Sequence, residues 1–149
     1  MTFAFNILWF VFGGILSAMV WILIGLAWCL TVVGIPFGVA CFRIAPFAAF
    51  PFGRRLIPGE WVGQKRIAGT GLANFLWVAF FGLWLAIGHA ILGVACIMTI
   101  IGIPAGIANF NLAQASFAPL GKVPVPKSVA DEAERQYARR RVDAGLARA

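Results

Sequence analysis

The fold is decided by one stretch of sequence, Thr31-Val32-Val33-Gly34-Ile35-Pro36-Phe37-Gly38, which returns as Thr99-Ile100-Ile101-Gly102-Ile103-Pro104-Ala105-Gly106. Thr31 and Thr99 stand 68 positions apart, and shifting the chain by that distance aligns residues 6–54 with residues 74–122 without a gap. Shared hydrophobicity does not explain the matched polar and glycine positions, which include Asn6 with Asn74, Gly14 with Gly82 and Gly25 with Gly93. The chain is therefore a tandem repeat of one unit.

Each copy of this stretch favours the end of one helix and the start of another. A glycine is common just past a helix end, and a proline is tolerated in the first turn of the next helix. We expect each repeat to be a long transmembrane helix, a Gly-Ile-Pro break and a shorter membrane-embedded or interfacial helix, from Pro36 to Phe50 and from Pro104 to Ala118. The break residues are Gly34, Pro36, Gly38, Gly102, Pro104 and Gly106.

Such breaks free backbone groups that lipid cannot satisfy, so they must be packed against protein or in contact with water. Paired breaks at matching positions of two repeats can mark a binding site, because half-helix ends present backbone dipoles. A tight turn near the membrane interface is the simpler interpretation, and we favour it.

The two repeats form two apolar blocks. Hydrophobic residues make up 62% of the chain and charged residues 11%, against about a quarter charged in soluble domains. Between Gly71 and Gly121 there is no charged residue, and from Thr2 to Phe52 the only one is Arg43. Each block exceeds the roughly 20 residues of one span. The protein is therefore predicted to be an all-α integral membrane protein, with its first block retained rather than cleaved as a signal peptide.

Charge divides the chain into four segments. They are membrane repeat 1 (residues 1–55), a basic cytoplasmic loop (56–70), membrane repeat 2 (71–122) and a charged, soluble, helical tail (123–149). The formal net charge of +7 is concentrated around the loop and in the tail. Because Lys and Arg near membrane spans favour the cytoplasm, we expect both segments to be cytoplasmic.

The number of crossings stays open at this stage. If both charged segments are cytoplasmic, each repeat enters and returns as a hairpin, the N-terminus is also inside, and the repeats are parallel rather than inverted. No polar turn lies near Gly25 or between His89 and Gly93, where we expect the outer bend. The alternative is one tilted span followed by a short interfacial helix. We favour the hairpins.

Polar side chains within or beside the apolar blocks are the candidates for a pore or polar lining. His89 is a functional hypothesis because ionisable groups inside membranes are costly. Its structural alternative is a hydrogen bond to a carbonyl at a helix bend, and its repeat mate Trp21 suits an interfacial position. The amides Asn6 and Asn74 also suit capping or interhelical bonding. The full candidate set is Asn6, Asn74, His89, Asn109, Asn111 and Gln114.

Four cations are expected to contact the anionic headgroups of the bilayer, because basic side chains reach toward them from span ends. They are Arg43, Arg54, Arg55 and Lys122. The sequence shows no catalytic set, phosphate-binding glycine loop or metal-ligand spacing. We therefore expect no enzyme activity, no cofactor and no metal. The short basic tail lacks nucleic-acid-reading elements, so we expect no nucleic acid partner.

Several strings resemble those of one family: Asn74-Phe75-Leu76-Trp77, Ile101-Gly102-Ile103-Pro104-Ala105-Gly106-Ile107-Ala108-Asn109-Phe110 and Pro119-Leu120-Gly121. They are similar to those of the YccF family of bacterial inner membrane proteins, from Asn6 to the basic tail. The resemblance implies two copies of an inner membrane component domain and a multi-pass location in the bacterial inner membrane. In the first copy Cys41 stands in place of Asn109, and no catalytic residue carries over.

Two functions from different classes fit these features. The first is an oligomeric channel or small transport component for ions or small solutes, since one protomer is too small to enclose a pathway. The second is a non-transporting membrane scaffold or accessory subunit, whose glycines pack helices against a membrane protein partner. Both are compatible with a homo-oligomer, which we expect. We favour the channel on sequence alone.

Overall fold

The computed structural model describes residues 2–65 and 69–146, which are mostly helical. Each repeat opens with a 28-residue helical stretch, Thr2–Cys29 or Thr70–Ile97, that is long and apolar enough to cross a bilayer. A shorter helix of 15 residues follows in each repeat, α3 (Ile35–Ala49) and α6 (Ile103–Phe117). Both shorter helices begin and end one residue earlier than the sequence indicates.

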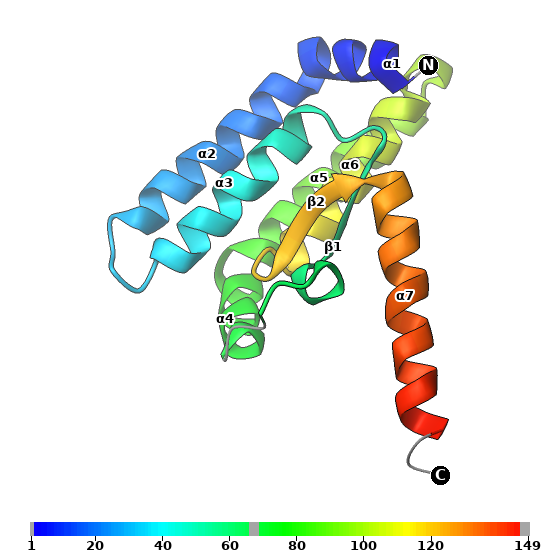
Figure 1. Ribbon diagram of the computed structural model, residues 1–149. Helices are drawn as coiled ribbons and strands as arrows, with labels where there is room; N and C mark the ends of the chain where they lie inside the picture. The colour runs from blue at the N-terminus through cyan, green and yellow to red at the C-terminus, as the bar shows by residue number, and fades with distance from the viewer. Residues whose placement is uncertain (1, 66–68, 147–149) are drawn as a thin grey trace.

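A π-helical segment divides each long stretch into two helices. In repeat 1 the order is α1 (Thr2–Trp9), η1 (Phe10–Gly14) and α2 (Ile15–Cys29); in repeat 2 it is α4 (Thr70–Trp77), η3 (Val78–Gly82) and α5 (Leu83–Ile97). Figure 1 shows α1 bending sharply away from α2 at this point. A π-segment is a common cause of a helix bend. Beyond the bend, α2 packs along α3 and α5 packs along α6, which gives two hairpins.

The turn of each hairpin is closed by its own polar groups. The Thr31 hydroxyl accepts a hydrogen bond from the Gly34 backbone N–H at 3.1 Å and donates to the Trp28 carbonyl at 3.2 Å. A Cβ on Gly34 would overlap the Trp28 carbonyl, so only glycine fits there. The second turn includes η4 (Ile100–Gly102), and Thr99 repeats both bonds. Each hairpin turn therefore satisfies polar groups by hydrogen bonds within the turn itself.

The expectation that each hairpin bends near Gly25 or Gly93 is wrong, because both glycines lie inside helices. The bends lie at residues 30–34 and 98–102. A Cβ on Gly38 would stand 2.7 Å from the Gly25 carbonyl oxygen, and one on Gly106 would stand 2.9 Å from the Gly93 oxygen. These glycines bring the two helices of a hairpin into close contact.

Two short strands join the repeats, and the all-α expectation is wrong to that extent. Strands β1 (Arg54–Pro58) and β2 (Lys122–Pro126) pair antiparallel. The segment 56–70, expected to be a loop, continues β1 into the 3₁₀ turn η2 (Gly59–Val62), and its residues 66–68 lie outside the described part. The tail continues β2 into α7 (Lys127–Leu146). Proline-containing strands of five residues show no clear alternation of polarity, which is why sequence reasoning missed them.

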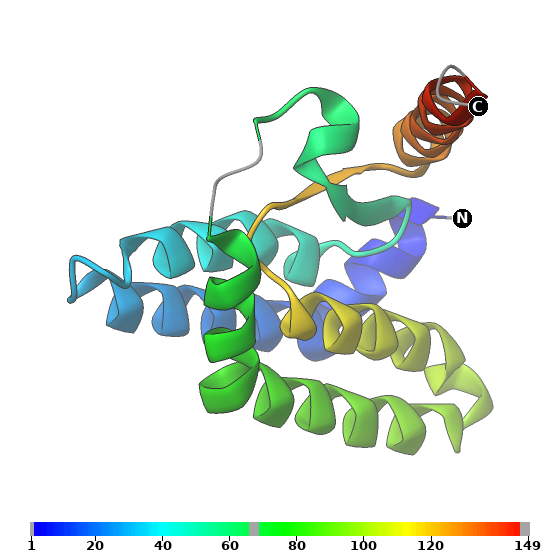
Figure 2. The same cartoon turned by 90° about the horizontal axis from the view of Figure 1, so that it is seen from below.

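The two repeats are related by a local two-fold axis. Leu56 and Pro124, which are equivalent positions of the repeats, face each other in the sheet, as pairing across a two-fold requires. Two backbone bonds obey the same symmetry: Gly59 N–H donates to the Gly121 carbonyl at 2.8 Å and Lys127 N–H to the Gly53 carbonyl at 2.9 Å. As a consequence, the tips of the two hairpins lie at opposite ends of the molecule (Figures 1 and 2).

The hairpins form one layer, and the strands and α7 lie on one side of it (Figure 2). We call the strands, η2 and α7 together the charged layer. The chain start belongs to the same side, because a Cβ on Gly53, which precedes β1, would stand 2.8 Å from the Thr2 side chain. Both long helical stretches therefore begin at the charged layer.

Aromatic side chains of both repeats share one core. The Trp77 ring of repeat 2 stacks on Trp21 and on Phe37 of repeat 1, with both centroid distances 6.1 Å. Phe81 packs its edge on Trp28 at 5.3 Å. Trp77 and Trp21 are fully buried. The core of the molecule thus needs both copies of the repeat.

Candidate functional site

Asn6 and Asn74 hold the chain where it leaves the shorter helix of its own repeat. Asn6 accepts a hydrogen bond from the Phe52 backbone N–H at 3.0 Å and donates to the Phe52 carbonyl at 3.1 Å. Asn74 makes the same two bonds with Leu120, at 3.1 and 3.2 Å. Each side-chain amide thus bonds one residue as a neighbouring strand would, with its oxygen accepting from the backbone N–H and its nitrogen donating to the backbone carbonyl.

His89 and Asn109 form a buried pair between α5 and α6. The His89 Nδ1 lies 3.1 Å from the Asn109 Oδ1, and the Asn109 amide nitrogen donates to the Ala105 carbonyl at 3.1 Å. His89 lies inside α5 rather than at a bend. Its repeat mate Trp21 is fully buried in the core that the two repeats share. The first repeat has Trp21 and Cys41 where the second has this polar pair.

Asn111 and Gln114 are the two candidate lining residues left with free amides. Asn111 is half-buried and Gln114 is exposed on α6. Within the described chain, neither side chain makes a hydrogen bond. Among residues 2–65 and 69–146, no group of three His, Cys, Asp or Glu side chains could hold a metal ion.

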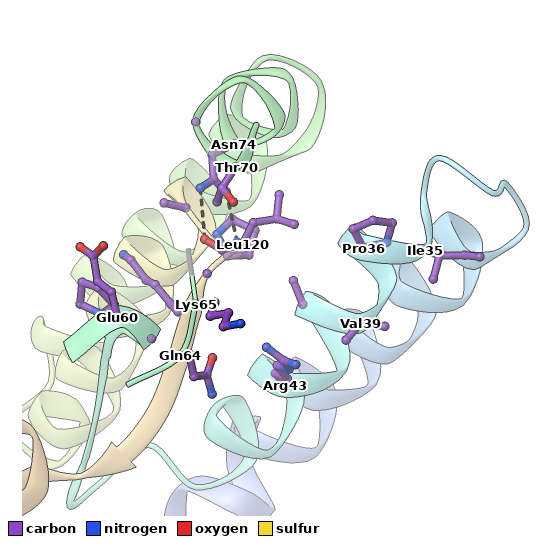
Figure 3. A pocket seen from close by; sticks show the side chains of 18 residues that line it. Ile35, Pro36, Val39, Arg43, Glu60, Gln64, Lys65, Thr70, Asn74 and Leu120 are labelled. Atoms are coloured by element: carbon purple, nitrogen blue, oxygen red, sulfur yellow. Dashed lines mark hydrogen bonds between the residues drawn. The ribbon is translucent and has the colours of Figure 1, made fainter. Parts of the chain in front are cut away.

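A basic crevice of about 470 Å³ lies where the hairpin layer meets the charged layer. One wall is α3, which contributes Val39 and Arg43, and the facing wall includes Gln64 from the segment after η2. Figure 3 shows Arg43 and Gln64 reaching toward the space between these walls, with Asn74 bonded to Leu120 at one end. The volume is in the range of small-molecule pockets.

Positive charge dominates this crevice. Its charged lining residues are Arg43, Lys65 and Lys122 against Glu60. Among the described residues, no carboxylate lies within ion-pair distance of any of these three cations. Burial lowers the pKa of Lys122 from its ordinary value, because the ammonium loses hydration. The positive charge of the crevice therefore favours binding of an anion.

The expected headgroup-contacting cations separate into two groups. Arg43 and Lys122 line the crevice together although they come from different repeats. Arg55 instead binds α7, through Asp131 at 2.7 Å and Glu134 at 3.2 Å. Arg54 is exposed and lies outside the crevice lining. Sequence reasoning missed Lys65 as a site residue, because only the general charge of its segment drew attention to it.

A second crevice, of about 300 Å³, lies between α1 and the start of α6. Its lining includes Phe5 and Phe12 from repeat 1 and Pro104 from repeat 2, and no charged residue is among the described residues that line it. In repeat 2 the position equivalent to Arg43 is taken by Asn111, which lines neither crevice. Of the two crevices, only the one beside α3 is basic.

The hairpin tips are apolar and exposed at both ends of the molecule. Leu30 and Val32 at the first tip are 87% and 85% exposed, and Met98 and Ile100 at the second are 82% and 87% exposed. Such contiguous apolar surface is typical of contact with lipid or with another protein.

Comparisons with known proteins agree with this architecture. The YccF family model, described as an inner membrane component domain, matches at residues 4–54 and again at 72–122, which confirms the tandem repeat. The Inner membrane protein YccF of Escherichia coli (strain K12) is 34% identical over 143 residues, covering 93% of this chain and 97% of that protein. Its namesake from Shigella flexneri gives the same values. No solved structure matches the chain significantly. With two matching domains and a relative similar over nearly its whole length, the chain belongs to the YccF family of inner membrane proteins.

Proposed function

We propose that the protein is a non-transporting membrane component that inserts both hairpins into the bilayer from one side and serves as a scaffold or accessory subunit for another membrane protein. The observation that supports this most is the arrangement of the two layers. The hairpin tips lie at opposite ends of one apolar layer, and the charged layer covers a single side of it (Figure 2).

The positions of the charges favour hairpins that lie along the membrane plane. If the hairpins ran across the bilayer, one tip would reach each surface, and β1 would lie at mid-depth with Arg54 and Arg55. An arginine at the bilayer centre costs about 3 kcal/mol even on insertion scales. With the hairpins in the plane, the charged layer faces water while both tips stay in lipid.

Helix length and turn chemistry support the same orientation. A helix of 15 residues, such as α3, is about 22 Å long, which is shorter than the hydrocarbon core of about 30 Å. Polar backbone groups must be satisfied inside lipid. The bonds of Thr31 and Thr99 with the glycines of their turns meet part of that need at the tips. The excess of positive charge on one side supports a cytoplasmic charged layer.

A channel or small transport component for ions or small solutes is the second candidate. The free amides of Asn111 and Gln114 on α6 favour it, because an assembly of several copies could turn them toward a shared pathway. The other candidate lining residues are engaged within one chain, as Asn74 and His89 are. This engagement is why we prefer the non-transporting function.

Cysteine labelling tests the one-sided insertion. Single cysteines replace Glu60, Val32 or Ile100 in a chain whose three native cysteines are changed to alanine. We expect a membrane-impermeant maleimide to label Glu60→Cys from the cytoplasmic side only, and to label Val32→Cys and Ile100→Cys from neither side. Labelling of either tip from the periplasmic side would show that the hairpins cross the membrane.

Ion flux in liposomes separates the two functions. We expect the purified protein to give no flux above empty liposomes across several ions and pH values. The contrary result is a flux that the substitutions Asn111→Leu and Gln114→Leu abolish. If these variants keep the oligomeric size of the unchanged protein, that result would establish a pore lined by α6.

A further inference from the structure

We infer that the basic crevice beside α3 binds the phosphate of an anionic phospholipid headgroup, with Arg43, Lys65 and Lys122 as its ligands. The inference rests on the one-sided insertion proposed above, which sets the crevice at the depth of the headgroups. It goes further by assigning a specific lipid site to one face of the molecule.

The crevice has the two-part chemistry of a phospholipid. Its hairpin wall is apolar along Ile35 and Val39 and ends at Arg43 on the same face of α3, as Figure 3 shows. The opposite wall belongs to the charged layer and supplies Lys65 and Lys122. An acyl chain or glycerol can lie against the first part while a phosphate meets the cations of the second.

The cations of the crevice are available for such a ligand. Arg43 and Lys65 are exposed, and within the described chain none of the three cations has a carboxylate partner. Lys122 is half-buried without a counter-ion, which is unfavourable for its ammonium until an anion binds. A phosphate held by several cations gains charge-assisted hydrogen bonds.

The two repeats differ in charge at the position of Arg43. In repeat 2 this position is taken by Asn111, so α6 offers no cation where α3 offers one. The second crevice, between α1 and the start of α6, has no charged residue in its described lining. Three cations from three different segments meet in the crevice beside α3, which suits a defined anionic ligand.

Native mass spectrometry of the full-length protein in detergent tests the site without depending on membrane orientation. The titrated ligands are phosphatidylglycerol, phosphatidylethanolamine and soluble glycerol phosphate. We compare the unchanged protein with the double variant Arg43→Gln/Lys122→Gln. The matched control is Arg54→Gln, because Arg54 is the repeat mate of Lys122 and lies outside the crevice.

We expect phosphatidylglycerol to bind in preference to phosphatidylethanolamine, and the double variant to lose at least about tenfold in affinity. The Arg54→Gln control should bind as the unchanged protein does. If glycerol phosphate binds as tightly as phosphatidylglycerol, the ligand is a soluble phosphate ester and not a lipid. If the two lipids bind equally well, or if the double variant and the Arg54→Gln control lose the same affinity, the proposed site is wrong.

The inference and the proposed orientation fail separately. Loss of lipid selectivity in detergent would disprove the lipid site without affecting the labelling result. Labelling of a hairpin tip from the periplasm would disprove the proposed orientation. A phosphatidylglycerol site that depends on Arg43 and Lys122 would still stand in that case.

Discussion

At the residue scale, the small side chains of the repeated stretch have separate roles. Gly34 and Gly102 close the turns, while Gly38 and Gly106 allow the two helices of each hairpin to touch. Because these roles come from contacts with the neighbouring helix or turn, they distinguish these glycines from Gly88, which has no described heavy atom near its missing Cβ.

The substitution Gly38→Ala should destabilise the first hairpin. Its Cβ would stand 2.7 Å from the Gly25 carbonyl oxygen and would also overlap the Cys29 sulfur. We expect a loss of about 1–3 kcal/mol, as for overpacking of a core, measured by denaturant unfolding in detergent. Gly88→Ala is the control, and it should be neutral or stabilising by up to about 1 kcal/mol. Equal effects of the two substitutions would contradict the close approach of α2 and α3.

The substitution Asn74→Ala should also cost stability, by about 1–3 kcal/mol, because it leaves both backbone groups of Leu120 without their partner. The same unfolding assay measures it. Asn111→Ala removes an amide that makes no hydrogen bond within the described residues, so its effect should stay within about 0.5 kcal/mol. A similar loss for both would show that Asn74 is not bound as described.

At the element scale, the helices follow from the sequence much better than the strands do. Pro36 marks the start of α3 to within one residue, and Gly34 lies in the turn that follows the end of α2 at Cys29, because both residues act locally. The strands form only because the two-fold symmetry brings Arg54–Pro58 beside Lys122–Pro126, and local sequence carries no sign of that pairing.

The same limit applies to the basic crevice. The sequence predicts headgroup contact for Arg43, the one charged residue within the first apolar block, and for Lys122, the first cation after the second block. Their meeting in one crevice depends on how the repeats pack, and no alignment of the chain with itself shows it. The bend at the π-segments is a further tertiary feature, since η1 and η3 have ordinary apolar helix sequences.

The attachment of α7 to the strands gives a prediction at this scale. Trp61 of η2 stacks on Tyr137 of α7 with ring centroids 5.4 Å apart, and Arg55 binds Asp131 and Glu134. Because the Arg55 pairs are over 40% exposed, we expect Arg55→Ala to cost at most about 1 kcal/mol.

Trp61→Ala should loosen α7 more than Arg55→Ala does, since it removes a large ring contact. Limited proteolysis within residues 127–146 measures the release of α7, and added salt should increase release in the unchanged protein slightly. Arg54→Ala is the control, because Arg54 makes no ion pair in the described structure. Release by that control as large as by Trp61→Ala would contradict the assigned contacts.

At the scale of the whole molecule, each repeat completes the other. Trp77 of the second repeat is packed among Trp21, Trp28 and Phe37 of the first, and each repeat supplies one of the two strands. Since a two-stranded sheet and half an aromatic core are insufficient alone, neither repeat should fold by itself.

Expressing the chain as two fragments, 1–64 and 65–149, tests this dependence. We expect the fragments to co-purify when they are co-expressed and to be degraded or aggregated when they are expressed singly. Trp77→Ala in the second fragment should weaken the association, because it removes the ring at the centre of the shared core. The matched substitution Trp84→Ala, at a 71% exposed position, should leave it intact. Stable, monomeric single fragments would contradict the shared core.

The two-fold axis through Leu56 and Pro124 also bears on ancestry. A primordial chain with one copy of the unit could have built this core only as a symmetric homodimer, with identical strands and hairpins meeting at the axis. Gene duplication and fusion would then have freed the two halves to diverge. Asn111 at the position equivalent to Arg43, and Trp21 at the position equivalent to His89, show how far the two halves differ: one half has a charge at the crevice, and the other has a polar pair between its helices.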